Sequence, residues 1–277
     1  MSPLTQILAI FAIAILAGFL GSLLGLGGGI IVVPALTLLF GIDIRMAIGA
    51  SIISVIATSS GAAAAYVKEH LANLRVAMFL EIGTTLGAIS GAYLAGVIHT
   101  RFLFILFGGL LAWSAIAMLK KRHEGEGIAS PSALADRLKL HGSFYDEAID
   151  QHVDYRVTRP GTGLGLMYLA GAASGLLGIG SGALKVPAMD LAMRLPMKVS
   201  TATSNFMIGV TAAASAGLYF VRGEIDPLLA GPVATGVLLG ATAGSRFLGR
   251  VESRVIRTVF VVVLIVVSVE MLVKGLR

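Results

Sequence analysis

The chain contains no cysteine, few charged residues and few aromatic ones. Without cysteine, disulfide bonds and thiolate metal ligands are excluded, although the redox compartment is left undetermined. Only 13% of the 277 residues are Asp, Glu, Lys or Arg, whereas 56% are hydrophobic. So few polar side chains cannot cover the surface of a water-soluble globule. The composition therefore predicts an integral membrane protein.

The formal charge of +6 is modest, and its Lys and Arg residues lie between apolar runs instead of forming one basic block. This distribution is typical of membrane topology signals and lipid-headgroup contacts. We therefore expect no nucleic-acid surface.

Eight apolar runs are each close to the ~20 residues that a helix needs to cross the hydrocarbon core. A chain in lipid must satisfy its backbone polar groups internally, so the expected fold is an all-α bundle. The first run lacks the basic residues of a signal peptide and is kept as a spanning helix. Two shorter apolar segments at 30–40 and 184–195 are expected to be broken or half-helices. The eight runs cover 4–23, 46–66, 76–98, 101–119, 161–177, 200–220, 227–249 and 255–274.

The chain is an internal duplication. The segment GLGGGIIVVP at 25–34 matches GIGSGALKVP at 178–187, and an offset of 153 residues keeps the two halves aligned without a gap. A chance match of apolar segments would not place glycines and prolines in register, and such repeats are frequent in secondary transporters. The matched pairs include Gly25 with Gly178, Gly29 with Gly182, Pro34 with Pro187, Ser51 with Ser204, and Tyr66 with Tyr219.

The Lys and Arg residues predict how the halves are oriented. With four crossings per half, 12 basic residues lie on one side and 8 on the other. With five elements per half, the division becomes 15 against 5, the asymmetry expected between cytoplasm and exterior. An odd number of elements inverts the second repeat. We therefore expect inverted repeats at 1–120 and 161–277, a cytoplasmic connector at 121–160, and both termini outside.

The connector holds Asp146, Asp150 and Asp154 at a spacing of four residues. This spacing favours one solvated face of a short amphipathic helix. A metal or regulatory site is the alternative, although no recognised ligand spacing is present.

The glycine motifs predict a break in each half, where one helix ends and another starts inside the bilayer. The N–H groups of a new helix start can hold an anion, and two copies would bring two such ends together. The residues expected at this site are Gly25, Gly27, Gly28, Gly29, Gly178, Gly180 and Gly182. Small-residue helix packing is the alternative, and we prefer it for the glycines spaced by four at 83–91 and 236–244.

Four polar side chains extend this candidate site. Lys185 lies three residues after Gly182 in an apolar segment, where a cation suits an anionic ligand. Its alternatives are snorkelling to the interface or pairing with Asp190. Ser51, Ser204 and Asn205 can donate hydrogen bonds to anion oxygens, or they can join helices.

Glu81 is the carboxylate of the third long run and is the candidate for carrying a coupling proton. Its alternative is a surface position, in which the acid reaches the lipid headgroups.

The paired motifs GLGGGIIVVP and GIGSGALKVP, with the segments GASIISV and TATSNFM after them, resemble the TauE/SafE family of membrane transporters. The resemblance covers nearly the whole chain apart from the connector. It implies export of a small sulfur-containing anion, such as sulfite or an organosulfonate, across the bacterial inner membrane under an ion gradient. The chain departs from the all-glycine pattern at Ser181, whose hydroxyl is therefore a further candidate for the site.

The expected function is a secondary transporter, not an enzyme, with a small anion and the bilayer as its partners and protons as a candidate coupling ion. No cofactor or metal is expected, and a homodimer is among the assemblies that the sequence allows. A passive anion channel and a non-transporting membrane subunit are the alternatives. An intramembrane enzyme is disfavoured because no nucleophile shares a membrane depth with a histidine.

Overall fold

The computed structural model describes residues 3–119 and 132–276 and confirms an all-α membrane fold. Seven of the helices in these ranges are long and apolar enough to cross a bilayer. The remaining expected run, 161–177, forms α7 (Pro160–Leu177), whose 18 residues extend about 27 Å at ~1.5 Å per residue. The seven are α1 (Pro3–Leu24), α3 (Ile44–Lys68), α4 (Leu74–Ala95), α5 (Thr100–Leu119), α9 (Met197–Val221), α10 (Pro227–Ser245) and α11 (Ser253–Leu276).

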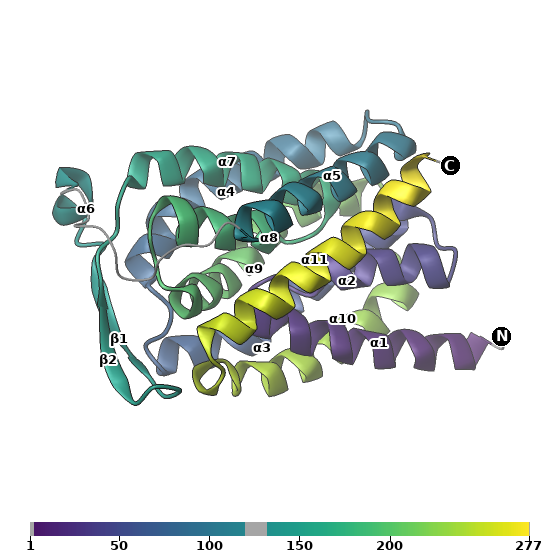
Figure 1. Cartoon of the computed structure of the whole chain (residues 1–277). Coiled ribbons are helices and arrows are strands. Elements are labelled where there is room, and N and C mark those ends of the chain that lie inside the picture. Colours follow the sequence, from purple (N-terminus) through teal and green to yellow (C-terminus); the bar gives the residue numbers. More distant parts are fainter. Residues whose placement is uncertain (1–2, 120–131, 277) are drawn as a thin grey trace.

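The long helices lie side by side (Figure 1). Many of their large apolar side chains are exposed. Leu16 is 64% exposed, Trp113 55% and Val262 54%. Apolar exposure on this scale is unfavourable in water and is typical of a lipid-facing surface. Many small residues of the same helices are buried between them, among them Gly87 and Gly91 on α4 and Gly236 and Gly240 on α10.

Each half also contains a short helix that widens after a proline. Helix α2 (Gly29–Pro34) continues as the π-helical η1 (Ala35–Leu39), and α8 (Gly182–Pro187) continues as η2 (Ala188–Ala192). Proline has no N–H, and its ring clashes with the carbonyl four residues back, so a regular turn cannot pass through it. A wider π-turn removes the conflict. The two short apolar segments are therefore short helices, as expected, and each starts at its glycine motif.

The helices pair in a pattern that repeats with the offset of 153 residues. Helix α4 packs along α7, and their repeat partners α10 and α1 pack along each other. Helices α5 and α11 form a further pair, as do α3 and α9. In the pairs α5–α11 and α3–α9, the two helices are repeat equivalents of each other. In the pairs α4–α7 and α1–α10, a helix of one half packs along a non-equivalent helix of the other half.

Glycines at the paired faces allow this close packing. A Cβ on Gly91 would lie 1.9 Å from the carbonyl oxygen of Ala172, and one on Gly240 would lie 1.9 Å from that of Ile15. Real Cβ atoms do not approach backbone so closely, so the packing interpretation of these four-spaced glycines is confirmed.

Gly240→Ala is therefore expected to destabilise the bundle. Overpacking of this kind costs about 1–3 kcal/mol or more, which lowers the midpoint of thermal unfolding by about 5 °C or more. The matched control is Gly231→Ala on the same helix, because nothing lies within 4 Å of its added Cβ. Unfolding of both variants is measured in detergent by size-exclusion chromatography after heating. Equal midpoints for the two variants would contradict the packing argument.

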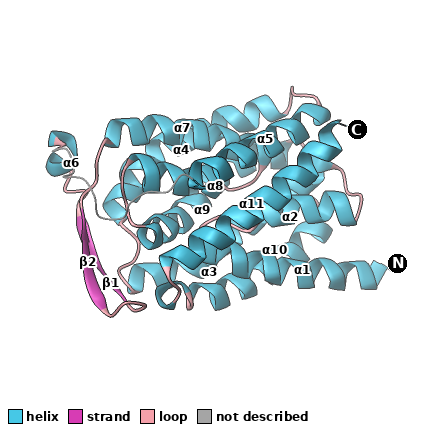
Figure 2. Cartoon of the chain, in the orientation of Figure 1, coloured by secondary structure: helices cyan, strands magenta, loops and turns pink. Residues whose placement is uncertain are grey.

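The connector forms a β-hairpin, so the expected amphipathic helix over Asp146, Asp150 and Asp154 is wrong. Strand β1 (Gly142–Asp146) pairs antiparallel with β2 (Gln151–Tyr155), after the short helix α6 (Ala133–Arg137) (Figure 2). Burial alternates along β1, with Phe144 and Asp146 buried and their neighbours exposed. The turn is stabilised by Asp146, whose Oδ1 accepts from the N–H of Ala148 at 3.0 Å.

The aspartates do not converge on a common point. Asp146 pairs with Lys198, whereas Asp150 accepts a hydrogen bond from Tyr145. Across the ranges that the structure describes, no three His, Asp or Glu side chains gather as metal ligands. The hairpin lies at the opposite end of the bundle from both chain ends (Figure 1).

Candidate functional site

The two glycine motifs lie against each other. Gly29 starts α2 and Gly182 starts α8. A Cβ on Gly29 would lie 2.8 Å from the carbonyl oxygen of Gly178, and one on Gly182 would lie 2.0 Å from that of Gly25. These contacts are repeat equivalents of each other. The structure therefore brings the starts of the two short helices together, with no room for a side chain between them.

Left-handed backbone conformations produce the breaks before α2 and α8. In the first motif, φ is 72° at Gly25, 79° at Gly27 and 71° at Gly28. The second motif has φ of 65° at Gly178, 74° at Gly180 and 59° at Ser181. Glycine adopts such angles without steric penalty, whereas serine does not. Ser181 is fully buried, and its hydroxyl donates to the carbonyl of Gly180 at 2.6 Å.

Ser51 and Ser204 hold these breaks from the neighbouring long helices. The Ser51 hydroxyl donates to the carbonyl oxygen of Gly178 at 2.6 Å, and the Ser204 hydroxyl donates to that of Gly25 at 2.8 Å. Each serine thus binds the loop of the opposite half. The sequence singled out both residues as ligands, and in this conformation both satisfy backbone groups that a broken helix leaves without partners.

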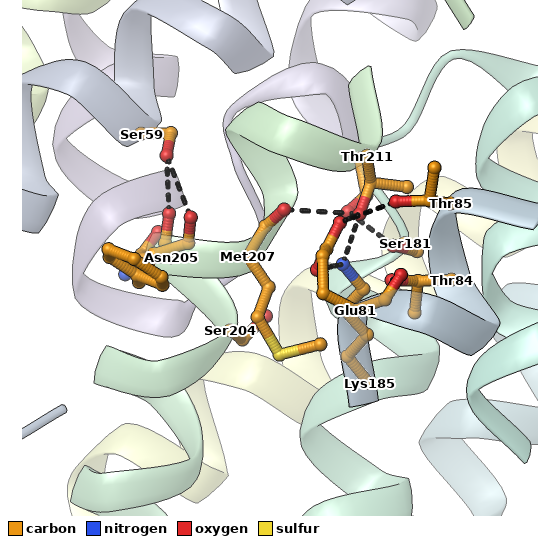
Figure 3. A network of polar contacts seen from close by, with 12 residues as sticks. Ser59, Glu81, Thr84, Thr85, Ser181, Lys185, Ser204, Asn205, Met207 and Thr211 are labelled. Atoms are coloured by element: carbon orange, nitrogen blue, oxygen red, sulfur yellow. Dashed lines mark hydrogen bonds and ion pairs between the residues drawn. The ribbon is translucent and has the colours of Figure 1, made fainter. Parts of the chain in front are cut away.

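Asn205 joins the halves at the next position of α9. Its Nδ2 donates to the carbonyl of Ser22, and its backbone carbonyl accepts from the Ser59 hydroxyl at 2.7 Å (Figure 3). Its Oδ1 is buried and has no hydrogen-bond partner. A buried amide oxygen without a donor is unfavourable. This oxygen can accept from a protonated or hydroxyl-bearing ligand.

A polar network surrounds Lys185, which is completely buried in α8. Its Nζ donates to Thr211 Oγ1 at 2.6 Å and lies 3.8 Å from Glu81 Oε2. Thr211 Oγ1 lies 2.7 Å from Glu81 Oε1 and can donate to it (Figure 3). The network joins α8 and α9 of the second half to α4 of the first. It places one cation and one carboxylate in the interior of the bundle.

The alternatives for Lys185 are wrong. Its side chain has no exposed area, so it does not snorkel to an interface. Asp190 forms an ion pair with Arg257 at 2.8 Å instead. The surface alternative for Glu81 is also wrong, because its side chain is only 15% exposed and points into the network.

The repeat equivalents of this network are apolar at two of three positions. With the offset of 153, Lys185 corresponds to Val32, Glu81 to Ala234 and Thr211 to Thr58. Val32 and Thr58 of the first half and Ala234 of the second are uncharged, so the fold does not require a charge at these equivalent positions. The charged network therefore occurs only once among these positions of the duplicated fold.

The sequence singled out Lys185 and Glu81 as separate candidates, without joining them, and Thr211 was not among the predicted site residues. The available signal was the pair of opposite charges inside apolar runs of different halves. Two such buried groups are expected to meet, because each is costly without a partner.

Comparison with known proteins identifies the family. The family described as "Sulfite exporter TauE/SafE" matches residues 10–271. The "Probable membrane transporter protein YunE" of Bacillus subtilis is 27% identical over 272 residues, 95% of this chain and 96% of the relative. YdhB of the same organism is 28% identical over 87% of this chain and 88% of the relative.

A relative from a different organism has the same description. MJ0441 of Methanocaldococcus jannaschii, also named a probable membrane transporter protein, is 27% identical over 72% of this chain and 67% of its own. No solved structure matches the chain significantly. The chain is a multi-pass membrane protein and belongs to the TauE/SafE family of membrane transporters.

Proposed function

We propose that the protein is a secondary transporter that exports a small anion by alternating access. The observation that carries the proposal is Lys185, a fully buried cation three residues after Gly182, where α8 starts at the contact between the two glycine motifs. A buried cation at a helix break is expensive unless it binds something negative. Thr211 adds a hydroxyl within reach of the same ligand. The names of the relatives, which describe membrane transporters, support the same class of function.

The proposed substrate is a sulfur-containing oxyanion such as sulfite or an organosulfonate. Its support is the description of the family, which names sulfite, together with the donor chemistry of the site. Ammonium and hydroxyl donors suit the oxygens of a sulfonate, of hydrogen sulfite or of a carboxylate. The substrate is proposed to bind at the Lys185 network, on α8 close to where that helix starts.

The two halves are proposed to be inverted relative to each other, with the connector in the cytoplasm of a bacterial cell and both termini outside. The reciprocal contacts of the glycine motifs and the 15 to 5 division of basic residues support this arrangement. The natural absence of cysteine makes it testable by labelling. Ala133→Cys and Ser2→Cys should react with an impermeant maleimide from opposite sides of the membrane. Reaction from the same side would refute the inverted model.

Counterflow in proteoliposomes tests the function itself. Vesicles loaded with unlabelled sulfite, sulfoacetate, sulfate or lactate are diluted into a trace of the same labelled anion. A transporter is expected to accumulate label transiently for at least one monovalent anion, whereas empty vesicles do not. A channel would equilibrate the label without a transient. The absence of counterflow for all four anions would contradict the proposal.

A further inference from the structure

We propose that Glu81 occupies the place of the transported anion on Lys185 and Thr211 in the unloaded protein, and that one proton on Glu81 accompanies each anion. This inference rests on the proposed transport function. It adds the coupling ion, the stoichiometry and the charge class of the substrate.

The two carboxylate oxygens of Glu81 have different surroundings. Oε1 is 2.7 Å from the Thr211 hydroxyl and 3.3 Å from the Thr85 hydroxyl, which donates to it. Oε2 is buried, lies 3.8 Å from the Lys185 ammonium and has no hydrogen-bond partner. Oε1 therefore uses donors that an anion would also use, while Oε2 is the oxygen that can take up a proton.

The charges around the site restrict what it can bind. Apart from Glu81, no Asp, Glu, Lys, Arg or His occurs in α4 at 76–95, α5 at 102–119, α7 at 160–177 or α9 at 199–221. In η2, Asp190 is paired with Arg257. The unloaded site thus contains one positive and one negative charge and is neutral.

Binding an anion alone would leave one uncompensated negative charge in the interior, which is strongly unfavourable. A proton that enters from the same solution as the anion binds Glu81 Oε2, neutralises the carboxylate and breaks its ion pair with Lys185. The Lys185 ammonium and the Thr211 hydroxyl then bind the anion, and the loaded site is neutral again. The site is therefore neutral both when it is unloaded and when it is loaded, and the conformational change moves no net charge across the membrane in either case.

The expected transport is therefore electroneutral symport of one proton with one monovalent oxyanion, such as a sulfonate, hydrogen sulfite or a carboxylate. A dianion such as sulfate would leave the loaded site with one excess charge and should be a poor substrate. The direction follows the sum of the two gradients. An anion that accumulates inside a cell leaves together with a proton when its own gradient exceeds the opposing proton gradient.

Glu81→Gln tests the coupling. Glutamine resembles a protonated carboxyl group in shape and charge, so the variant should still bind the anion. We expect counterflow of the labelled monoanion within about tenfold of the original rate, and we expect its dependence on pH to disappear. Uptake driven by an imposed pH gradient should fall to the level of simple equilibration. In the original protein, a potassium diffusion potential set with valinomycin should not change that uptake.

Glu270→Gln is the matched control, because Glu270 is an exposed carboxylate on the spanning helix α11. It should retain gradient-driven accumulation. Accumulation by Glu81→Gln at the original level would overturn the coupling role, as would a clear response of the original protein to membrane potential. A complete lack of counterflow by the original protein is a different result, which would contradict the proposed transport function and the symport with it.

A second, independent observation concerns the connector hairpin, residues 142–155. Asp146 Oδ1 lies 2.6 Å from Lys198 Nζ at the start of α9, and both side chains are buried. Asn73, at the start of α4, donates through Nδ2 to the Tyr155 hydroxyl at 2.9 Å. At the turn, Glu147 lies 3.6 Å from Arg250 of η3 (Leu248–Arg250). The hairpin thus contacts the start of α4 in the first half, and the start of α9 and η3 in the second.

The duplication suggests what the buried ion pair does. Lys198 is the repeat equivalent of Arg45, which starts α3 and pairs with Glu224 at 3.5 Å. Glu224 follows α9, and its own repeat equivalent is Leu71, which cannot pair with a cation. The hairpin residue Asp146 supplies the carboxylate that Leu71 does not. Each start of the central pair α3 and α9 is thereby joined to an acidic residue.

We infer that the connector hairpin is a latch that closes the bundle at its own end through Asp146 and Lys198. Opening of the site toward that end then requires the pair to separate. Glu69, at the end of α3, lies in the same region. Burial raises the pKa of its carboxyl group, and the charge of Glu147 raises that pKa further, while Arg250 lowers it.

Alkylation of a single cysteine tests the latch without measuring transport. Thr201→Cys places a thiol at a fully buried position of α9, three residues after Lys198. We expect Asp146→Asn to increase its rate of reaction with N-ethylmaleimide at least about tenfold. The double variant Asp146→Asn and Lys198→Gln removes both charges of the buried pair and should show the same increase. Glu147→Gln on the same hairpin should not. Rates within twofold of the parent in both Asp146 variants would overturn the inference.

Discussion

Replacement of Lys185 by glutamine is expected to reduce the initial rate of anion counterflow by at least about a hundredfold. Removing one partner of a buried charged pair costs about 3–5 kcal/mol, and each ~1.4 kcal/mol corresponds to a tenfold change in binding. The variant loses the cation that the anion needs and leaves the Glu81 carboxylate buried without its ion-pair partner. The effect is measured as the initial rate of counterflow of a labelled monoanion, in vesicles that contain equal amounts of the two proteins.

Two controls separate loss of binding from loss of folding. Lys274→Gln removes another lysine of a spanning helix, one that donates to the carbonyl of Thr37 outside the Lys185 network, and it should reduce the rate less than about threefold. The double variant Lys185→Gln and Glu81→Gln contains no unpaired charge, so it should unfold near the temperature of the parent protein while remaining inactive. Counterflow by Lys185→Gln above a third of the parent rate would refute the central role of this residue.

Much of the fold can be predicted from the sequence because its signals are local or periodic. The apolar runs have the length of spanning helices, and the glycine motifs contain the residues that a left-handed break requires at 25–28 and 178–180. The offset of 153 residues also matches contacts that the structure makes twice, such as Ser51 with Gly178 and Ser204 with Gly25. These features depend on backbone conformation and on small residue size, which a sequence displays directly.

The connector could not be assigned correctly from the spacing of its aspartates. Intervals of four residues at 146, 150 and 154 are compatible with a helix, but these residues fall at the end of one strand, in a turn and in the second strand. The alternation of buried and exposed residues in GSFYD is only five residues long. Such a short pattern determines a strand only when a surface is available to cover it, and that surface comes from helices of both halves.

The sequence also did not predict which residues contact each other in the candidate site. Glu81 and Lys185 are 104 positions apart, and their contact depends on how α4 packs beside α8 and α9. Sequence proximity favoured Asp190 as the partner of Lys185, five residues away. The π-turn after Pro187 directs Asp190 instead toward Arg257 on α11. Tertiary packing, not local spacing, decides which of two acids a buried lysine meets.

Gly182→Ala is expected to reduce transport strongly and to destabilise the protein, because the motif contact has no space for a methyl group. Its Cβ would lie 2.0 Å from the Gly25 carbonyl oxygen and 2.6 Å from the Leu26 Cα, and both are backbone atoms that cannot rotate away. The two helix starts must then separate, and the bond from Ser204 to Gly25 is disturbed with them. We expect counterflow to fall more than about thirtyfold, because a displacement of ~1 Å at a binding site can reduce rates ~100-fold.

Gly29→Ala tests the repeat-equivalent contact, where the crowding is less severe. Its Cβ would lie 2.6 Å from the Ser51 hydroxyl, which can rotate, and 2.8 Å from the Gly178 carbonyl. The loss of transport should therefore be smaller than in Gly182→Ala. Gly165→Ala on α7, with nothing within 4 Å, should behave as the parent. All rates are measured well below the unfolding midpoint of each variant. If transport followed only the unfolding midpoints, the motifs would be packing devices; a loss in excess of the stability change would assign them to the substrate path.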